Sequence, residues 1–325
     1  MKPTRRDFLK NSAAAGLASA LAGGMATPII EASGDQTVLQ QPSASPQPAP
    51  TGKSDKETIR IAVVQQAANP GRVEENRNKA LRYAGAALAK GADVVLFHEE
   101  MLIGCVENMR ELAEPLGGPT MRAFQSLLKG SKALVLCGLQ ERSGDRYYIA
   151  ATLIGSGGVV ANYHKTHLFW KADGPRHEPS IYTPGDRLMT FDVRGHKSGV
   201  MICYDGDFPE MARSYANLNC RILFWMNNRT SRGHQEVAGL AAANSIIMAT
   251  SCCCGVDETG RKCSGGSNIT DAHGKLLAEI WDKEGVIYAN VQPAEAMRIR
   301  KENCLYRGQR GDLYFYPGKE AQRGG

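Results

Sequence analysis

One stretch, Ser198–Arg213, which reads SGVMICYDGDFPEMAR, decides the fold class of this 325-residue chain. Its apolar first half predicts a buried β-strand, Asp205–Asp207 predict a tight turn, and Pro209 opens a helix. This order places Cys203 at the end of a strand, beside backbone N–H groups and the positive end of a helix. Such surroundings favour a thiolate and can stabilise an oxyanion. Cys203 is therefore a candidate nucleophile, although a cysteine that ends a strand is more often a core residue.

Strand and helix patterns alternate on both sides of this stretch. The β-branched run that begins at Ile59 predicts a buried strand, and residues 74–90 show helical spacing that Gly91 ends. Strands alternating with helices, together with a few hairpins, predict an α/β domain with mixed sheets. The remaining predicted elements are strands over 92–100, 133–141, 221–228 and 247–256, helices over 119–129 and 237–246, two strands joined at 155–158, and a late hairpin over 266–280.

Two further segments carry candidate catalytic residues. Residues 92–101, ADVVLFHEEM, end a predicted strand whose alternation puts Glu99 on the same face as Phe97. A carboxylate at the end of a buried strand is a candidate general base, or else a solvated loop acid. Residues 161–170, ANYHKTHLFW, place Lys165 after a strand, where an ammonium group can stabilise a tetrahedral intermediate. A lone lysine is more often a surface residue.

Taken together and in this order, the segments resemble the nitrilase superfamily, the Glu-Lys-Cys carbon–nitrogen hydrolases. The resemblance covers roughly residues 58–316. The matched motifs are Phe97-His98-Glu99, Lys165-Thr166-His167-Leu168, Tyr182-Thr183-Pro184-Gly185, Ile202-Cys203-Tyr204-Asp205, Phe208-Pro209-Glu210, Gly266-Ser267-Asn268-Ile269, Asp271-Ala272-His273-Gly274 and Arg310-Gly311-Asp312-Leu313-Tyr314.

The resemblance implies a four-layer α-β-β-α sandwich and a set of catalytic residues. It implies that Glu99 is the general base, Lys165 the oxyanion stabiliser and Cys203 the nucleophile, with Glu178 as a second glutamate. The neighbouring Glu100 competes for the role of base, and the register of the Phe97-x-Glu99 motif decides for Glu99. Substrate-binding residues implied by position are Tyr204, Asn228 and Arg229.

The implied reaction is hydrolysis of a non-peptide carbon–nitrogen bond in a small-molecule amide, through a cysteine thioester that releases ammonia or an amine. No metal and no organic cofactor is implied. Ala241–Ser245 resembles the aliphatic amidases and formamidases, whereas Gly206 and Asp207 stand where D-amino-acid carbamoylases have arginines. Hydrolysis of an N-carbamoyl compound or a nitrile remains an alternative, as does a non-catalytic binding protein on the same fold. One departure is His98, where the family usually has proline.

The nine cysteines match no common zinc spacing. Most lie in apolar segments, so buried inert thiols are expected rather than a disulfide framework or a metal site. A redox or metal role for the run Cys252–Cys254 is disfavoured, because alternation along one strand would put Cys253 on the face opposite its two neighbours.

The N-terminal sequence predicts export. Arg5-Arg6-Asp7-Phe8-Leu9-Lys10 resembles a twin-arginine signal, so we expect a signal peptide over 1–32, a disordered Pro/Ser/Gln-rich linker over 33–57, the hydrolase domain over 58–316 and a flexible tail over 317–325. The expected location is the periplasm or the exterior of the cell, reached through the twin-arginine export machinery. The family also implies a homo-oligomer.

Composition limits which other classes of partner are expected. The formal net charge is +6, part of it within the expected signal, and no Lys/Arg run is interleaved with aromatic residues, so nucleic acid is not expected. No apolar stretch approaches the roughly 20 residues that a membrane span needs, so none is expected in the mature form.

Overall fold

The computed structural model describes residues 58–67, 69–170, 177–229, 233–256, 260–303 and 308–309. The predicted signal, linker and tail, and the motif Arg310–Tyr314, lie outside these residues.

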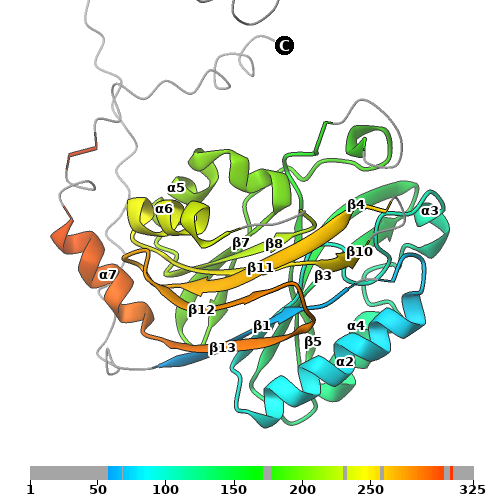
Figure 1. The fold of residues 1–325 in the computed structure, drawn as a ribbon, viewed down its shortest axis with the longest axis horizontal. Coiled ribbons are helices and arrows are strands. Elements are labelled where there is room, and N and C mark those ends of the chain that lie inside the picture. Colours follow the sequence, from blue (N-terminus) through cyan, green and yellow to red (C-terminus); the bar gives the residue numbers. More distant parts are fainter. Residues whose placement is uncertain are drawn as a thin grey trace, which may run out of the picture. The chain divides into compact units, whose positions relative to one another are not determined.

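The first of two sheets holds the strands β13-β1-β2-β3-β4-β5 in that order. Helices α2 (Val73–Ala89) and α4 (Pro119–Leu127) cover its outer face, since α2 contacts β1, β2 and β13 while α4 contacts β4 and β5 (Figure 1). The short α3 (Met109–Leu112) lies between these helices in the chain. The strands are β1 (Ile59–Gln65), β2 (Val94–Leu96), β3 (Leu134–Ser143), β4 (Arg146–Gly155), β5 (Gly158–His164) and β13 (Gly285–Val291).

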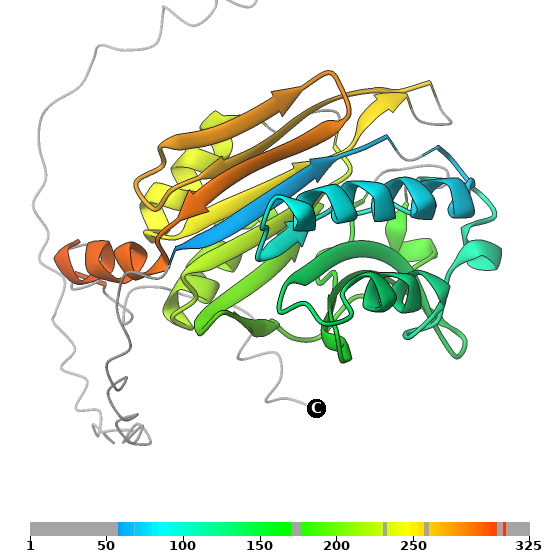
Figure 2. The same cartoon turned by 90° about the horizontal axis from the view of Figure 1, so that it is seen from below.

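The second sheet has the order β10-β11-β9-β8-β7-β6, and β12 pairs with β11. Helices α5 (Pro209–Asn217) and α6 (His234–Asn244) cover its outer face, on the side away from α2 and α4 (Figures 1 and 2). Helix α7 (Pro293–Glu302) follows β13. The strands are β6 (Thr190–Val193), β7 (His196–Ile202), β8 (Ile222–Asn227), β9 (Ile247–Cys252), β10 (Cys254–Val256), β11 (Lys262–Thr270) and β12 (Leu276–Trp281).

Strand alternation separates two apolar cores. On β8, Phe224 and Met226 belong to the core shared with the first sheet, whereas Leu223 and Trp225 pack beneath α5 and α6. All four side chains are fully buried, and each such burial contributes about 1.5–3 kcal/mol before entropy is counted. Two sheets face to face with helices outside both confirm the predicted α-β-β-α sandwich.

Two predicted strands were partly wrong. The strand expected over 92–100 ends at Leu96, and the chain then turns across Gly138 of β3, where an added Cβ would stand 2.1 Å from the carbonyl oxygen of Glu99. The alternation therefore does not extend to Glu99. The strand expected over 247–256 breaks at Cys253, opposite the part of β11 where Gly265 and Gly266 have positive φ.

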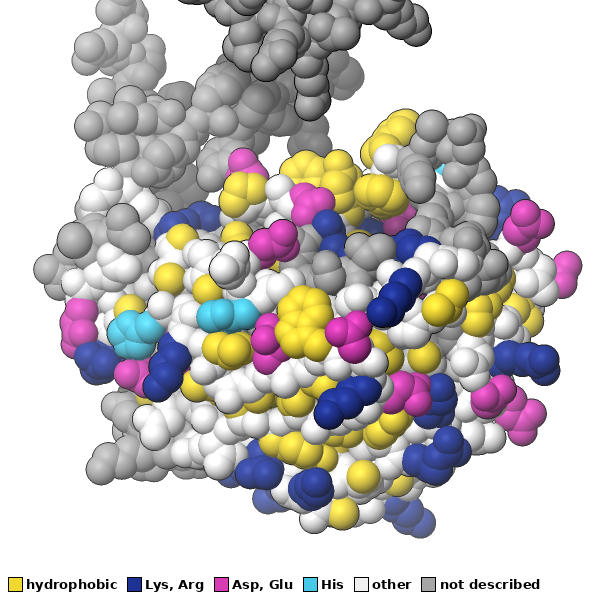
Figure 3. Space-filling view, viewed as in Figure 1, with side chains coloured by type: hydrophobic (Ala, Val, Ile, Leu, Met, Phe, Trp, Pro, Cys, Tyr) yellow, Lys and Arg dark blue, Asp and Glu magenta, His cyan; other side chains and the backbone are white. Residues whose placement is uncertain are grey.

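The other predicted helices, hairpins and the strand-turn-helix around Cys203 are confirmed, while β6, β13, α3 and α7 were not predicted. Most described cysteines are buried, as expected: Cys137, Cys220, Cys252, Cys253, Cys254 and Cys263. Within the described residues, no helix is long and apolar enough to cross a membrane. Charged side chains of both signs are interspersed over the face drawn in Figure 3.

Candidate active site

The turn that follows β7 presents Cys203 in a constrained conformation. Cys203 has φ +43°, in the left-handed region, and opens the 3-10 turn η3 (Cys203–Asp207). Its carbonyl oxygen accepts hydrogen bonds of 3.1 Å from Trp225 Nε1 and 3.1 Å from Arg229 Nη2. At Gly206, a Cβ would stand 2.0 Å from the Trp225 ring, so the turn needs glycine to pass this indole. A non-glycine residue in this region persists where its surroundings over-determine it, as at many functional sites.

The carboxylate of Asp205 holds this turn against the lysine loop. Oδ2 accepts the Ile202 N–H at 2.9 Å and the Tyr163 hydroxyl at 2.7 Å. Oδ1 accepts the Thr166 hydroxyl at 2.9 Å and the His167 N–H at 2.9 Å. Burial would raise the pKa of the fully buried Asp205, but hydrogen bonds from the His167 side chain, the Ile202 N–H, the Tyr163 hydroxyl and the His167 N–H keep it below the usual value.

A buried lysine joins two glutamates at the centre of the site. Lys165 Nζ donates to Glu99 Oε1 at 2.7 Å and to Glu178 Oε1 at 2.7 Å. Lys165 is only 1% exposed, so the solvated position typical of a lone lysine does not apply here. Glu178, in the short helix η2 (Glu178–Ser180), also accepts the Phe169 N–H through Oε2 at 2.7 Å.

The Pro-Gly turn fixes the backbone of the same lysine. Gly185 N donates to Lys165 O at 2.8 Å, while Lys165 N donates to Ile149 O at 2.9 Å. A Cβ at Gly185 would stand 2.2 Å from the carbonyl oxygen of His164. The glycine of Tyr182-Thr183-Pro184-Gly185 thus permits the close approach that anchors the loop.

Asn228 holds the candidate base Glu99 at the carboxylate oxygen that Lys165 does not contact. Its N–H donates to Glu99 Oε2 at 2.9 Å, and its side-chain amide donates to Glu100. Cys253 Sγ lies 2.8 Å from Asn228 Oδ1, and both terminal nitrogens of Arg261 lie 3.2 Å from Asn228 O. Both oxygens of Glu99 are therefore held, one by Lys165 and one by a backbone N–H.

Burial governs the protonation of the site. It raises the pKa of the Cys203 thiol to about 12, helped by the charge of Glu99 and opposed by Lys165 and Arg229. Burial also raises the pKa of Glu178 to about 7, against the attraction of Lys165. Burial would lower the pKa of Lys165, but Glu99, Cys203 and Glu178 raise it well above the usual value. The thiol is therefore neutral at pH 7 and the lysine charged, so attack by sulfur requires a base.

Glu100 is a second buried carboxyl beside Glu99. Burial raises its pKa to about 8, and the charges of Glu99 and Glu178 add to this shift. Glu99 contacts Lys165 directly, whereas Glu100 contacts the side chain of Asn228. The structure thus gives the two neighbours different partners.

The structure brings most of the predicted site residues together. Glu99, Lys165, Glu178 and Asn228 share one hydrogen-bond network, and Arg229 reaches the carbonyl of Cys203. The half-buried ring of Tyr204 instead meets Phe169 and Phe208 edge-on, with centroids 5.4 Å and 5.2 Å away. The departure at His98 is a fully buried ring whose two nitrogens have no hydrogen-bond partner among the described residues.

Sequence reasoning gave no role to Asp205 or Arg261, while it expected the segment Trp225–Arg229 near the pocket from its position in the family. Asp205 stands in the motif around Cys203 and could have been singled out from it, whereas no local pattern marks Arg261. Within the described residues, no group of three His, Cys, Asp or Glu side chains is arranged to hold a metal ion.

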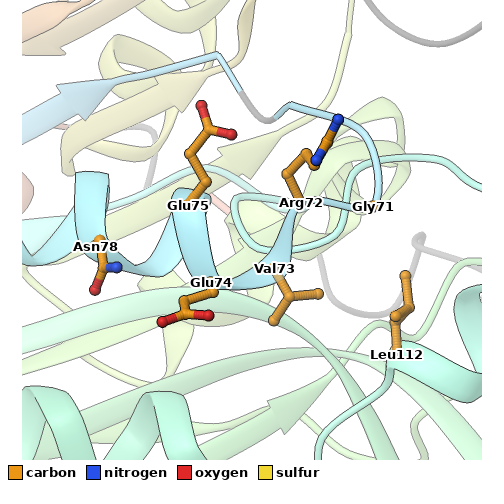
Figure 4. A pocket seen from close by; sticks show the side chains of 7 residues that line it. All are labelled: Gly71, Arg72, Val73, Glu74, Glu75, Asn78 and Leu112. Atoms are coloured by element: carbon orange, nitrogen blue, oxygen red, sulfur yellow. The ribbon is translucent and has the colours of Figure 1, made fainter.

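A surface hollow of about 620 Å³ lies elsewhere, where α2 begins (Figure 4). Side chains from the start of α2 and from Leu112 of α3 line it, and none of them belongs to the network described above. Its lining residues are Gly71, Arg72, Val73, Glu74, Glu75, Asn78 and Leu112.

The sequence is similar to that of known carbon-nitrogen hydrolases and amidases. Residues 60–301 match the model of the carbon-nitrogen hydrolase family. The chain is 30% identical to an (R)-stereoselective amidase from a Pseudomonas species, over 68% of this chain and 80% of that protein. It is 26% identical to the human omega-amidase NIT2, over 79% of this chain and 97% of that protein.

Solved structures share the fold. A CN-hydrolase superfamily protein from Xanthomonas campestris superposes with a TM-score of 0.70 at 21% identity, covering 81% of this chain and 100% of that chain. An amidase from Nesterenkonia superposes with a TM-score of 0.64 at 22% identity, covering 77% of this chain and 96% of that chain.

Proposed function

This chain belongs to the carbon–nitrogen hydrolase family and is an amidase-like hydrolase, and we propose that it cleaves its amide through a thioester on Cys203. The observation that carries the proposal is the buried Lys165 ammonium, which bridges Glu99 and Glu178 beside the strained cysteine turn. A neutral thiol, a carboxylate and a fixed cation are the groups that acyl transfer needs.

Acylation begins from the neutral thiol. Glu99 accepts the thiol proton as the sulfur of Cys203 attacks the amide carbon and forms the C–S bond. Lys165 and the backbone N–H of Tyr204 stabilise the negative charge on the carbonyl oxygen. Glu99 then gives the proton to the leaving nitrogen, the C–N bond breaks, and ammonia or an amine departs.

Deacylation repeats these roles with water. Glu99 takes a proton from the water that attacks the thioester carbonyl, and the C–S bond breaks with return of a proton to sulfur. Glu178 assists by holding Lys165, because its Oε1 is the second acceptor of that ammonium. The acid product is released and the free thiol is restored.

The three residues implied as substrate-binding divide by their contacts. Tyr204 offers its backbone N–H to the oxyanion. Asn228 acts on substrate through Glu99, because both its backbone and its side chain are occupied by glutamates. Arg229 contacts Cys203 O, so of the three side chains we propose it as the one that faces the substrate.

The substrate is an amide of a small molecule. Two relatives are amidases by name, and the Ala241–Ser245 segment resembles aliphatic amidases and formamidases. The test is a screen of formamide, aliphatic amides, carbamoyl compounds and nitriles with the native chain and Cys203→Ala. Release of ammonia from an amide by the native chain alone supports the proposal. Activity confined to carbamoyl compounds or nitriles would contradict it.

We also propose that residues 1–32 are a twin-arginine signal and that the enzyme acts in the periplasm or outside the cell. Support comes from Arg5-Arg6 followed by Asp7-Phe8-Leu9-Lys10. Replacing Arg5 and Arg6 by lysine should abolish processed protein outside the cytoplasm, as measured by cell fractionation. Unchanged recovery there would contradict export by this route.

We further propose that the folded domain, residues 58–316, assembles into a homo-oligomer, as the family resemblance implies. Sedimentation at micromolar concentration should show a particle larger than one chain. A strictly monomeric particle would contradict this.

A further inference from the structure

We propose that the ion pair between Asp207 and Arg229 sets the substrate class, so that the site accepts amides with an uncharged acyl group and rejects amides that carry a carboxylate. The inference rests on the proposed function, because it concerns the acyl part of the same amide.

The guanidinium of Arg229 lies beside the reacting residue. Its Nη2 donates to Cys203 O at 3.1 Å and to Asp207 Oδ1 at 2.7 Å. The next residue back, Asn228, holds the carboxylate of Glu99 through its N–H. Arg229 is thus fixed between the nucleophile turn and the base, and its charge lowers the pKa of the Cys203 thiol against the effect of burial.

Asp207 removes the attraction that this cation would exert on an anionic substrate. An unpaired arginine next to an active site attracts carboxylates and can bind them through two parallel hydrogen bonds. Here Nη2 is already shared between a carboxylate and a carbonyl. The side chains of Arg229 and Asp207 are 24% and 35% exposed, so the pair is within reach of a bound molecule.

The surrounding charges work in the same direction. Glu99, Glu100 and Glu178 lie together in the buried network, with Lys165 and Arg261 as the neighbouring cations. A substrate carboxylate would lie close to the charges of Glu99 and Glu178, which already raise the pKa of the buried Glu100. Like charges at short range disfavour binding.

The uncharged neighbours of the turn are aromatic. Tyr204 contacts the rings of Phe169 and Phe208, and Phe169 is 36% exposed. The N–H of Phe169 is held by Glu178, so this ring borders the catalytic network. An apolar acyl group can gain free energy by covering such a surface, whereas a carboxylate would lose hydration there.

The test compares two amides of similar shape, succinamate and 4-methylpentanamide, which differ by the exchange of a carboxylate for an isopropyl group. With the native full chain, kcat/KM should be at least about tenfold higher for 4-methylpentanamide. In Asp207→Asn, the ratio of succinamate to 4-methylpentanamide should rise about tenfold, because the guanidinium becomes available. This gain should disappear in Asp207→Asn/Arg229→Gln.

Glu302→Gln is the matched control, since it removes an ion pair of the same length, 2.7 Å to Arg298, on the surface of α7. It should leave the ratio unchanged. A native preference for succinamate, or an unchanged ratio in Asp207→Asn, would overturn the inference.

If the native chain hydrolyses neither of these two amides, the inference is judged by binding, while the proposed function is judged by the wider screen of amides. Calorimetry with Cys203→Ala should then show succinamate binding about tenfold tighter when Asp207→Asn is added. Equal affinity in the two variants would overturn it.

Discussion

Lys165 Nζ donates a hydrogen bond of 2.7 Å to Glu99 Oε1, and both residues are at most 2% exposed. Two opposite charges taken out of water are stable only when each is paired, since the desolvation of either ion alone costs several kcal/mol. The pair therefore fixes a carboxylate and a cation at one place without access of bulk water. The proposed hydrolysis at Cys203 requires both.

Lys165→Ala should lower kcat/KM about 100-fold or more, as the loss of one oxyanion donor does elsewhere. It should also destabilise the fold by about 3–5 kcal/mol, because Glu99 and Glu178 lose their shared cation. Steady-state kinetics and denaturant unfolding measure the two effects. Lys262→Ala is the control, because Lys262 is 74% exposed and its ion pair with Asp282 is 3.8 Å long. Equal behaviour of the two variants would contradict this account of Lys165.

Glu100→Gln should stabilise the protein at pH 8 relative to the native chain, but little at pH 4. The pKa of Glu100 is about 8 in the folded state and near 4.5 when unfolded, so the folded state binds its proton more tightly. Native stability from this group is full below pH 4.5 and is lost as pH rises towards 8. The amide cannot ionise and can still accept from Asn228, so the difference should reach a few kcal/mol. Denaturant unfolding at both pH values measures it, and a parallel pH dependence of the two proteins would refute the prediction.

Gly206→Ala should reduce both activity and stability. The new Cβ would stand 2.0 Å from the Trp225 ring, so the indole must move and its hydrogen bond to Cys203 O is lost. A strained core insertion typically costs about 1–3 kcal/mol. Gly157→Ala is the matched control, because nothing lies within 4 Å of its Cβ. If Gly206→Ala and Gly157→Ala change thermal unfolding and turnover equally, the close contact between Gly206 and the Trp225 ring does not matter for activity or stability.

The sequence predicted those parts of the fold whose signal is local. The strand, turn and helix around Cys203 were predictable because apolar run, turn residues and Pro209 follow one another directly. Strand β13 was missed because it forms an edge of the first sheet, is mostly half-buried and gains its place only by pairing with β1, more than 200 residues earlier. The break at Cys253 depends on Gly265 and Gly266 of the facing strand, which no pattern around Cys253 reveals.

The candidate site likewise contains residues that the sequence predicted and residues that it did not. Glu99, Lys165 and Cys203 each stand in a motif that the family resemblance identifies, and in the structure the segments around these three residues lie together. Arg261 was not predictable, because its contact with Asn228 joins positions 33 residues apart, outside any shared motif. The ion pair between Asp207 and Arg229 also joins two separate segments, so the sequence alone did not reveal it.

In the proposed reaction Cys203 carries the acyl group, and mass spectrometry of the trapped protein can detect it there. The full chain is mixed with a slowly hydrolysed amide or ester, quenched in acid and digested. We predict an acyl adduct on the peptide containing Cys203 and on no other cysteine, with no adduct and no turnover in Cys203→Ala, because the sulfur forms the covalent intermediate. An adduct on another cysteine, or full activity in Cys203→Ala, would contradict the account.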